Sequence, residues 1–147
     1  MISLKNNNSY NSKIILILTS FVSIIILNIL IIYFKNIIGN ILPVEINPTK
    51  PIISIYYIMP LFISPIIEEI FFRKIIPQKL IKKGIKEKEA DLITNLLFSV
   101  AHLNPFLIPY FINGLIYSNS FRKTNDITVP IIIHILYNTF VCLINFI

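Results

Sequence analysis

The sequence predicts an all-α membrane protein, a polytopic helical bundle in which short or broken helices surround a site within the membrane. Of the 147 residues, 55% are hydrophobic and only 14% are charged, whereas a soluble domain carries about 25% charged residues. The mean hydropathy is +0.77. A chain of this length is expected to form a single domain.

The charge balance favours a membrane rather than a nucleic-acid partner. The formal net charge is +6, and in a membrane protein such a surplus reflects cytoplasmic loops facing anionic lipid headgroups. The single cysteine, Cys142, lies in a hydrophobic run. An intrachain disulfide and a cysteine-based zinc site are therefore excluded, and we interpret Cys142 as a small buried apolar residue.

Three segments divide the chain. Residues 1–13 are polar and rich in asparagine, which is typical of a short disordered tail. Residues 14–34 carry no charge and are long enough to cross about 30 Å of hydrocarbon, so residues 14–50 are predicted to be a retained transmembrane helix and a loop. Residues 51–147 are predicted to form the catalytic core.

The core begins with an apolar segment over residues 52–72, in which Ser64 is expected to cap a helix that restarts at Pro65. Residues 73–91 are strongly charged but contain spaced apolar residues, which predicts an amphipathic helix on the membrane surface. Gly84 is expected to end that helix.

Three further helices complete the core. Residues 92–103 and 109–121 are apolar, and together they give only about 45 Å of helix where two crossings need about 60 Å. These helices are therefore expected to be short, tilted or broken around a wet cavity. Asp126 or Thr128 can cap the last helix, which has Pro130 in its first turn.

The distribution of Lys and Arg predicts a cytoplasmic N-terminus. With that orientation, 11 of the 13 basic residues lie inside, and only Lys35 and Lys50 lie outside. An excess of basic residues in cytoplasmic loops is the usual pattern of multi-pass proteins of the cell membrane.

Glu68, Glu69 and Arg73 interrupt an apolar run, where ionised groups are costly unless they are paired or hydrated. One interpretation is a helix end at the membrane surface with the charges in water. The other is a site. Glu69 and Arg73 are four residues apart and can pair on one helix face, whereas Glu68 is rotated by about 100° and can face a cavity.

The two histidines of the chain, His102 and His134, also lie in apolar helical runs. Counting helical rise from the predicted cytoplasmic ends places Glu68, His102 and His134 about 7 to 15 Å deep, in one layer. Asn138 is one turn from His134, and an imidazole and an amide so placed can hold a developing oxyanion. The sequence contains no His-Glu-x-x-His, Gly-x-Gly-Asp or Gly-x-Ser pattern, which leaves glutamate and histidine to activate a water molecule.

These residues resemble the motifs of the CPBP membrane proteases, the CAAX protease and bacteriocin-processing family, also called ABI. Its Glu-Glu-x-x-x-Arg motif matches residues 68–73, Phe-x-x-x-His matches 98–102, and His-x-x-x-Asn matches 134–138. The resemblance covers about residue 57 to the C-terminus. It implies a metal-independent intramembrane glutamate endopeptidase.

The same resemblance implies a role for each residue of the motifs. Glu68 and His102 would activate the attacking water, His134 and Asn138 would stabilise the oxyanion, and Glu69 with Arg73 would support the site. The expected partners are a peptide or membrane-protein substrate, the lipid bilayer, and a second copy or partner subunit. No cofactor is expected.

Two other functions remain open at this point. Glu68, His102 and His134 are a possible ligand set for a catalytic zinc ion, which takes three protein ligands and a water molecule. Alternatively, the chain keeps the fold without catalysis, as a bacteriocin-immunity or partner-binding membrane protein.

Overall fold

The computed structural model describes residues 2–39 and 58–144, with side chains described for 10–37 and 58–144. Every element in these ranges is helical, and no strand occurs in them, which confirms the predicted all-α class. The elements are α1 (Ile2–Gly39), η2 (Met59–Ile63), α2 (Ser64–Glu69), η3 (Ile70–Ile75), α3 (Ile76–Lys82), α4 (Glu87–Ala101), α5 (Ile108–Thr124) and α6 (Thr128–Ile144). The η elements are π-helical turns, and they belong to one continuous helical run that also includes α2 and α3.

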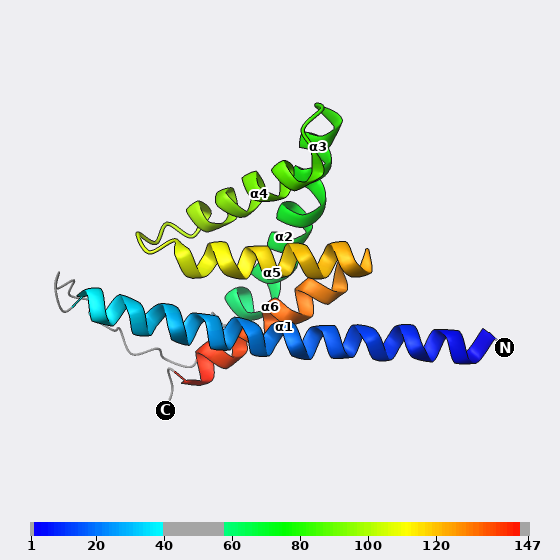
Figure 1. The fold of residues 1–147 in the computed structure, drawn as a ribbon, viewed down its shortest axis with the longest axis horizontal. Coiled ribbons are helices and arrows are strands. Elements are labelled where there is room, and N and C mark those ends of the chain that lie inside the picture. The colour runs from blue at the N-terminus through cyan, green and yellow to red at the C-terminus, as the bar shows by residue number, and fades with distance from the viewer. Residues whose placement is uncertain (1, 40–57, 145–147) are drawn as a thin grey trace.

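Helix α1 packs along α5 and α6, and α4 packs against the other side of α5 (Figure 1). The run from η2 to η3 packs against α6, α4 and α5 and so brings the carboxylates into the bundle. The buried apolar core is small, and it joins α1, η3, α4, α5 and α6 through Ile24, Phe72, Phe98, Tyr117, Val129 and Ile133.

Helix α1 begins at Ile2, so the prediction of a disordered tail over residues 1–13 is wrong. One physical reason is the ion pair between Lys13 Nζ and Asp126 Oδ2, which are 2.7 Å apart and tie this end of α1 to the turn before α6. Within residues 10–37 of α1 an 18-residue window has a mean hydropathy of 2.9, and this segment is long enough to cross a membrane. The helix also includes the first five residues of the predicted loop over 35–50, whose remainder lies outside the described residues.

Helices α4, α5 and α6 are short, as expected. They contain 15, 17 and 17 residues, which gives about 22 to 26 Å of length against the roughly 30 Å of hydrocarbon. Within the described ranges α1 alone is long and apolar enough to span a membrane by itself, and α6 is a shorter apolar helix. The crossings by α4 and α5 therefore stay predictions, as does the division into three segments.

Two predicted helix ends are confirmed. Gly84 follows the last turn of α3 with φ +89°, a backbone conformation that glycine adopts readily. Before α6, Asp126 Oδ1 accepts hydrogen bonds from the backbone N–H of Thr128 at 3.0 Å and from its hydroxyl at 2.7 Å. This carboxylate therefore caps the last helix.

The predicted helix restart at Ser64 is wrong. Ser64 has helical backbone angles, and its hydroxyl donates to Glu68 Oε1 instead of capping the chain. The helical run continues through Pro65 because the chain widens to π-helical spacing before it, where the Ser64 N–H bonds Met59 O, five residues back.

Candidate active site

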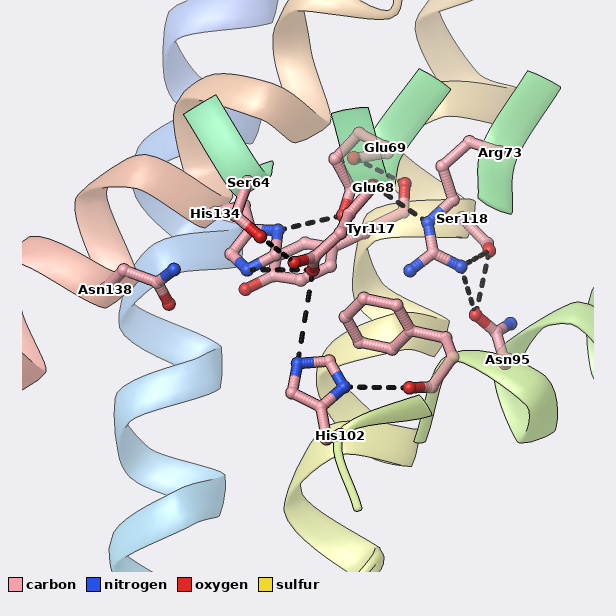
Figure 2. A network of polar contacts seen from close by, with 12 residues as sticks. Ser64, Glu68, Glu69, Arg73, Asn95, His102, Tyr117, Ser118, His134 and Asn138 are labelled. Atoms are coloured by element: carbon pink, nitrogen blue, oxygen red, sulfur yellow. Dashed lines mark hydrogen bonds and ion pairs between the residues drawn. The ribbon is translucent and has the colours of Figure 1, made fainter. Parts of the chain in front are cut away.

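The carboxylate of Glu68 lies where two histidines from different helices converge. Its Oε2 atom is 4.0 Å from His102 Nε2, at the end of α4, and 4.0 Å from His134 Nε2, in α6. Figure 2 shows both imidazoles pointing at this one oxygen. The distance is too long for a direct hydrogen bond, but one water oxygen can lie within hydrogen-bonding distance of such a pair. The structure brings these three predicted site residues together.

Hydrogen bonds on the far side of each imidazole orient both rings. His102 Nδ1 lies 2.8 Å from the carbonyl oxygen of Phe98, which can only accept, so Nδ1 carries the proton. His134 Nδ1 lies 3.0 Å from Glu69 Oε1 and donates to that carboxylate. Both Nε2 atoms therefore face Glu68, and in a neutral ring Nε2 is the acceptor.

Ser64 fixes the other oxygen of Glu68. The Ser64 hydroxyl donates to Oε1, one turn away on the same helical run. Oε2 is buried and has no hydrogen-bond partner among the described residues. The carboxylate thus has one oxygen held by the protein and one directed at the two histidines.

Glu69 and Arg73 form the predicted ion pair, with Arg73 Nε 2.8 Å from Glu69 Oε2 and both side chains fully buried. Arg73 is buried within the bundle, where its guanidinium has polar partners, and its predicted depth at the membrane interface stays a prediction. Its Nη1 donates to Asn95 Oδ1 and, at 3.1 Å, to the Ser118 hydroxyl. The guanidinium carbon also lies 4.8 Å from the ring centre of Phe98.

Asn138 comes from the same face of α6 as His134, but its amide already has a partner. Asn138 Nδ2 donates to the carbonyl oxygen of Pro60 at 3.0 Å. That oxygen is available because the helical donor five residues on would be Pro65, which has no N–H. Nδ2 carries two protons, so one stays available after this bond is made.

The histidines and Asn138 line a cavity of about 450 Å³. Its walls also carry aromatic rings, of which Tyr110 stacks on His102 at 4.1 Å and Tyr117 on His134 at 4.8 Å between ring centres. Two buried amides, Asn28 and Asn113, line it as well. The cavity is therefore mostly apolar with a few polar groups, as is usual for a site that binds a small molecule or a peptide.

The zinc alternative was tested against the donor geometry. Within residues 2–39 and 58–144, no three His, Cys, Asp or Glu side chains are placed to hold one metal ion. His134 and Glu68 do face each other, but the second carboxylate, Glu69, is occupied by Arg73 and by the Nδ1 of His134. Glu68, His102 and His134 nevertheless converge, with Oε2 4.0 Å from each Nε2, so a metal-independent reaction stays a proposal.

Sequence reasoning missed several residues that support the site. Asn95 Oδ1 accepts from both Arg73 and Ser118, and it is fully buried. Asn95 is seven residues before His102, which is two helical turns, so the face of α4 that carries the histidine also carries this amide. Ser118 and Tyr117 gave no signal in the sequence, because a serine and a tyrosine are common in apolar helices.

Comparison with known proteins adds a family. The model of the type II CAAX prenyl endopeptidase Rce1-like family matches residues 50–140. The chain is 36% identical over 111 aligned residues to the membrane-embedded CAAX protease MroQ of Staphylococcus aureus (strain USA300), an alignment that covers 66% of the chain. It is 34% identical over 108 aligned residues to the putative membrane peptidase YdiL of Bacillus subtilis (strain 168), which covers 69% of the chain.

In each case the match spans 44% of the relative's own length. No solved structure matches the chain. Both relatives are named as membrane proteins, which supports a location in the membrane and is consistent with the apolar length of α1. Because the family model covers more than half of the chain, the chain belongs to the Rce1-like family of type II CAAX prenyl endopeptidases, within the CPBP membrane proteins.

Proposed function

We propose that this chain is a metal-independent intramembrane endopeptidase that hydrolyses a peptide bond with water activated by Glu68 and His102. One observation carries the proposal: two imidazole Nε2 atoms from different helices lie 4.0 Å from one carboxylate oxygen, and this oxygen has no hydrogen-bond partner among the described residues. The family and the relatives named as proteases support the same class of reaction.

In the proposed first step, a water molecule lies between Glu68 Oε2 and the two Nε2 atoms. Glu68 takes one proton from the water as its oxygen bonds to the carbonyl carbon of the substrate, and the π electron pair of the carbonyl moves to its oxygen. His102 Nε2, an acceptor in the neutral ring, holds the second proton of the water and so orients the attack. A base placed in this way contributes about 10²–10⁴-fold in rate.

In the second step the tetrahedral intermediate collapses. The electron pair of the oxyanion re-forms the carbonyl, the bond from carbon to nitrogen breaks, and Glu68 returns its proton to the leaving amine. The products are one new carboxylic acid, which gives up its remaining proton to water, and one new amine. Atoms and charge balance without a metal or another co-reactant.

The oxyanion between these steps needs hydrogen-bond donors. Asn138 Nδ2 has a second proton free after its bond to Pro60 O. In its imidazolium form His134 donates from Nδ1 to Glu69 and from Nε2 towards the cavity. Glu69 and Arg73 contribute by fixing this ring, because Glu69 accepts from His134 Nδ1 and Arg73 pairs with Glu69.

The substrate is proposed to be a peptide or a membrane protein that reaches the cavity from the bilayer.

We also propose that the chain is a multi-pass protein with a cytoplasmic N-terminus. Ion pairs gathered at one end of the bundle support this orientation. Lys13 pairs with Asp126, and Arg122 pairs with Asp91 and lies 3.9 Å from Glu87. At the other end Lys35 lies 5.0 Å from the ring centre of Phe106.

The test is the cleavage of a peptide library by purified protein in lipid nanodiscs, with wild type compared to Glu68→Gln. Glu89→Gln is the matched control, because Glu89 is exposed in the first turn of α4. We expect cleavage by wild type and by the control, and a loss of about 10²–10⁴-fold for Glu68→Gln with an unchanged unfolding temperature. If Glu68→Gln cleaves as well as wild type, or if wild type cleaves nothing in the library or in a membrane-protein mixture, the proposal is wrong.

A further inference from the structure

Tyr117 presents a buried hydroxyl that the mechanism above does not use. The side chain is 1% exposed and lies in α5, and it also lines the cavity. Its ring stacks on the imidazole of His134, with ring centres 4.8 Å apart and an angle of 19° between the planes. Figure 2 shows the phenol lying against that imidazole, beside the carboxylate of Glu68.

The hydroxyl of Tyr117 has no hydrogen-bond partner among the described residues. A buried hydroxyl without a partner loses the free energy of its hydration and gains nothing in return, so such a group calls for an explanation. Packing alone does not supply one. Phenylalanine would offer the same ring to His134, and to the Arg73 guanidinium 5.8 Å from the ring centre, without that cost.

Glu68 Oε2 is a second buried atom without a partner in the same site. The two atoms have opposite character, because Oε2 accepts hydrogen bonds when ionised and the hydroxyl can donate one. The tetrahedral intermediate offers the Tyr117 hydroxyl an acceptor, its oxyanion, at the stage when Oε2 holds the proton that it took from the water. The free protein offers the hydroxyl no such acceptor among the described residues.

We propose that the Tyr117 hydroxyl is a third oxyanion donor, acting beside His134 and Asn138. The inference rests on the proposed function and deepens it. The stack on His134 fixes the plane of the phenol, and burial keeps water from competing for the hydroxyl. A donor that is unpaired until the intermediate forms stabilises the transition state more than the substrate, which is the requirement for raising kcat.

The test compares Tyr117→Phe with wild type, using a peptide that wild type cleaves and a phosphonate analogue of that peptide. The phosphonate is tetrahedral and anionic, as the intermediate is. Tyr33→Phe is the matched control, because Tyr33 is 62% exposed on α1 and does not line the cavity. Unfolding temperatures are measured for all the variants.

We expect Tyr117→Phe to lose about 10²–10³-fold in kcat with little change in KM, the loss that one oxyanion donor typically causes. Binding of the phosphonate should weaken by a similar factor. The unfolding temperature should stay the same or rise, because the variant removes a hydroxyl without a partner. Tyr33→Phe should match wild type throughout.

Wild-type kcat and phosphonate affinity in Tyr117→Phe would overturn the inference, and so would a fall in kcat matched by an equal fall in stability. Glu68→Gln in the same assay separates this failure from that of the proposed function. If Glu68→Gln is inactive while Tyr117→Phe is normal, only the role of Tyr117 is wrong. If Glu68→Gln is active, the proposed function itself is wrong.

Discussion

At the scale of single residues, two adjacent carboxylates differ because their surroundings differ. Glu69 is fully buried between Arg73 and His134, and each of its oxygens accepts one hydrogen bond. Glu68 is 25% exposed and shares only one oxygen with a protein donor, Ser64. A single helical step of about 100° thus separates a carboxylate that orients other groups from one that can meet a substrate.

The buried pair predicts a strong effect of Arg73 on stability. Arg73→Ala leaves Glu69 buried with only His134 to bond, and removing one partner of a buried ion pair costs about 3–5 kcal/mol. We expect the unfolding temperature in lipid nanodiscs to fall sharply. Lys74→Ala is the control, because the neighbouring Lys74 side chain is exposed. Equal unfolding temperatures for the two variants would contradict the account of Glu69 and Arg73.

At the scale of elements, the close approach of α4 and α5 positions the groups behind the site. Gly114 in α5 faces Asn95 in α4, and a Cβ atom added there would lie 2.8 Å from Asn95 Oδ1 and 3.2 Å from Phe98 Cδ1. The Asn95 side chain cannot move aside without breaking hydrogen bonds, since its oxygen accepts from Arg73 and Ser118. The glycine is needed here for space.

Gly114→Ala is therefore expected to destabilise the protein by about 1–3 kcal/mol, the usual cost of overpacking. Activity should fall as well, because a displaced Asn95 disturbs Arg73 and, through Glu69, the ring of His134. Asn119→Ala, at an exposed position of the same helix, is the control. Chemical denaturation followed by helical circular dichroism measures the difference, and a Gly114→Ala variant as stable as the control would refute the packing argument.

The turn between α5 and α6 predicts a dependence of stability on pH. Hydrogen bonds from Lys13 and from Thr128 lower the pKa of Asp126 from 3.8 to about 2. A carboxyl whose pKa is lowered by folding contributes its stability above the unfolded pKa and loses it as the pH falls through the folded value. The contribution of Asp126 is therefore complete above pH ~4 and is lost towards pH ~2.

The measurement is the difference in unfolding temperature between wild type and Asp126→Asn, followed from pH 6 to pH 2. Asparagine keeps the ability to cap α6 but cannot form the ion pair with Lys13. We expect wild type to be the more stable above pH ~4 and the difference to shrink below it. A difference that stays constant over this range would show that the ion pair contributes nothing.

At the scale of the whole molecule, the sequence predicted which residues come together better than it predicted where the helices begin. The convergence of Glu68, His102 and His134 followed from helical spacing and from the cost of charge in an apolar run. The helix over residues 2–13 could not be predicted, because the contact that anchors it, from Lys13 to Asp126, joins positions far apart in the sequence.

The role of Ser64 was also missed for a physical reason. A serine before a proline is a typical helix start, and nothing local indicates that the chain continues with π-helical spacing instead. The partners of Arg73 were missed because Asn95 and Ser118 come from other helices. Local pattern therefore predicted which residues come together, and packing decided what holds them.

The gathering of charge at one end of the bundle predicts the orientation in the membrane. Ion pairs tie Lys13 to Asp126 and Arg122 to Asp91 there, and Figure 1 shows the end of α5 and the start of α4 on the same side. In a Cys142→Ser background, we expect Lys83→Cys to resist an impermeant thiol reagent in intact cells and to react after permeabilisation. Lys35→Cys should react in intact cells, and the reverse pattern would invert the topology.

The central claim, that the hydrolysis needs no metal, is tested most directly by the turnover of purified wild type after exhaustive chelation, measured beside Asn138→Ala. Without a metal, the oxyanion relies on protein donors, and the loss of one donor costs about 10²–10³-fold in rate. The account predicts unchanged turnover of the chelated wild type and a loss of that size for Asn138→Ala, while Asn119→Ala stays normal. A chelated wild type that is inactive and recovers with zinc, together with a nearly normal Asn138→Ala, would contradict it.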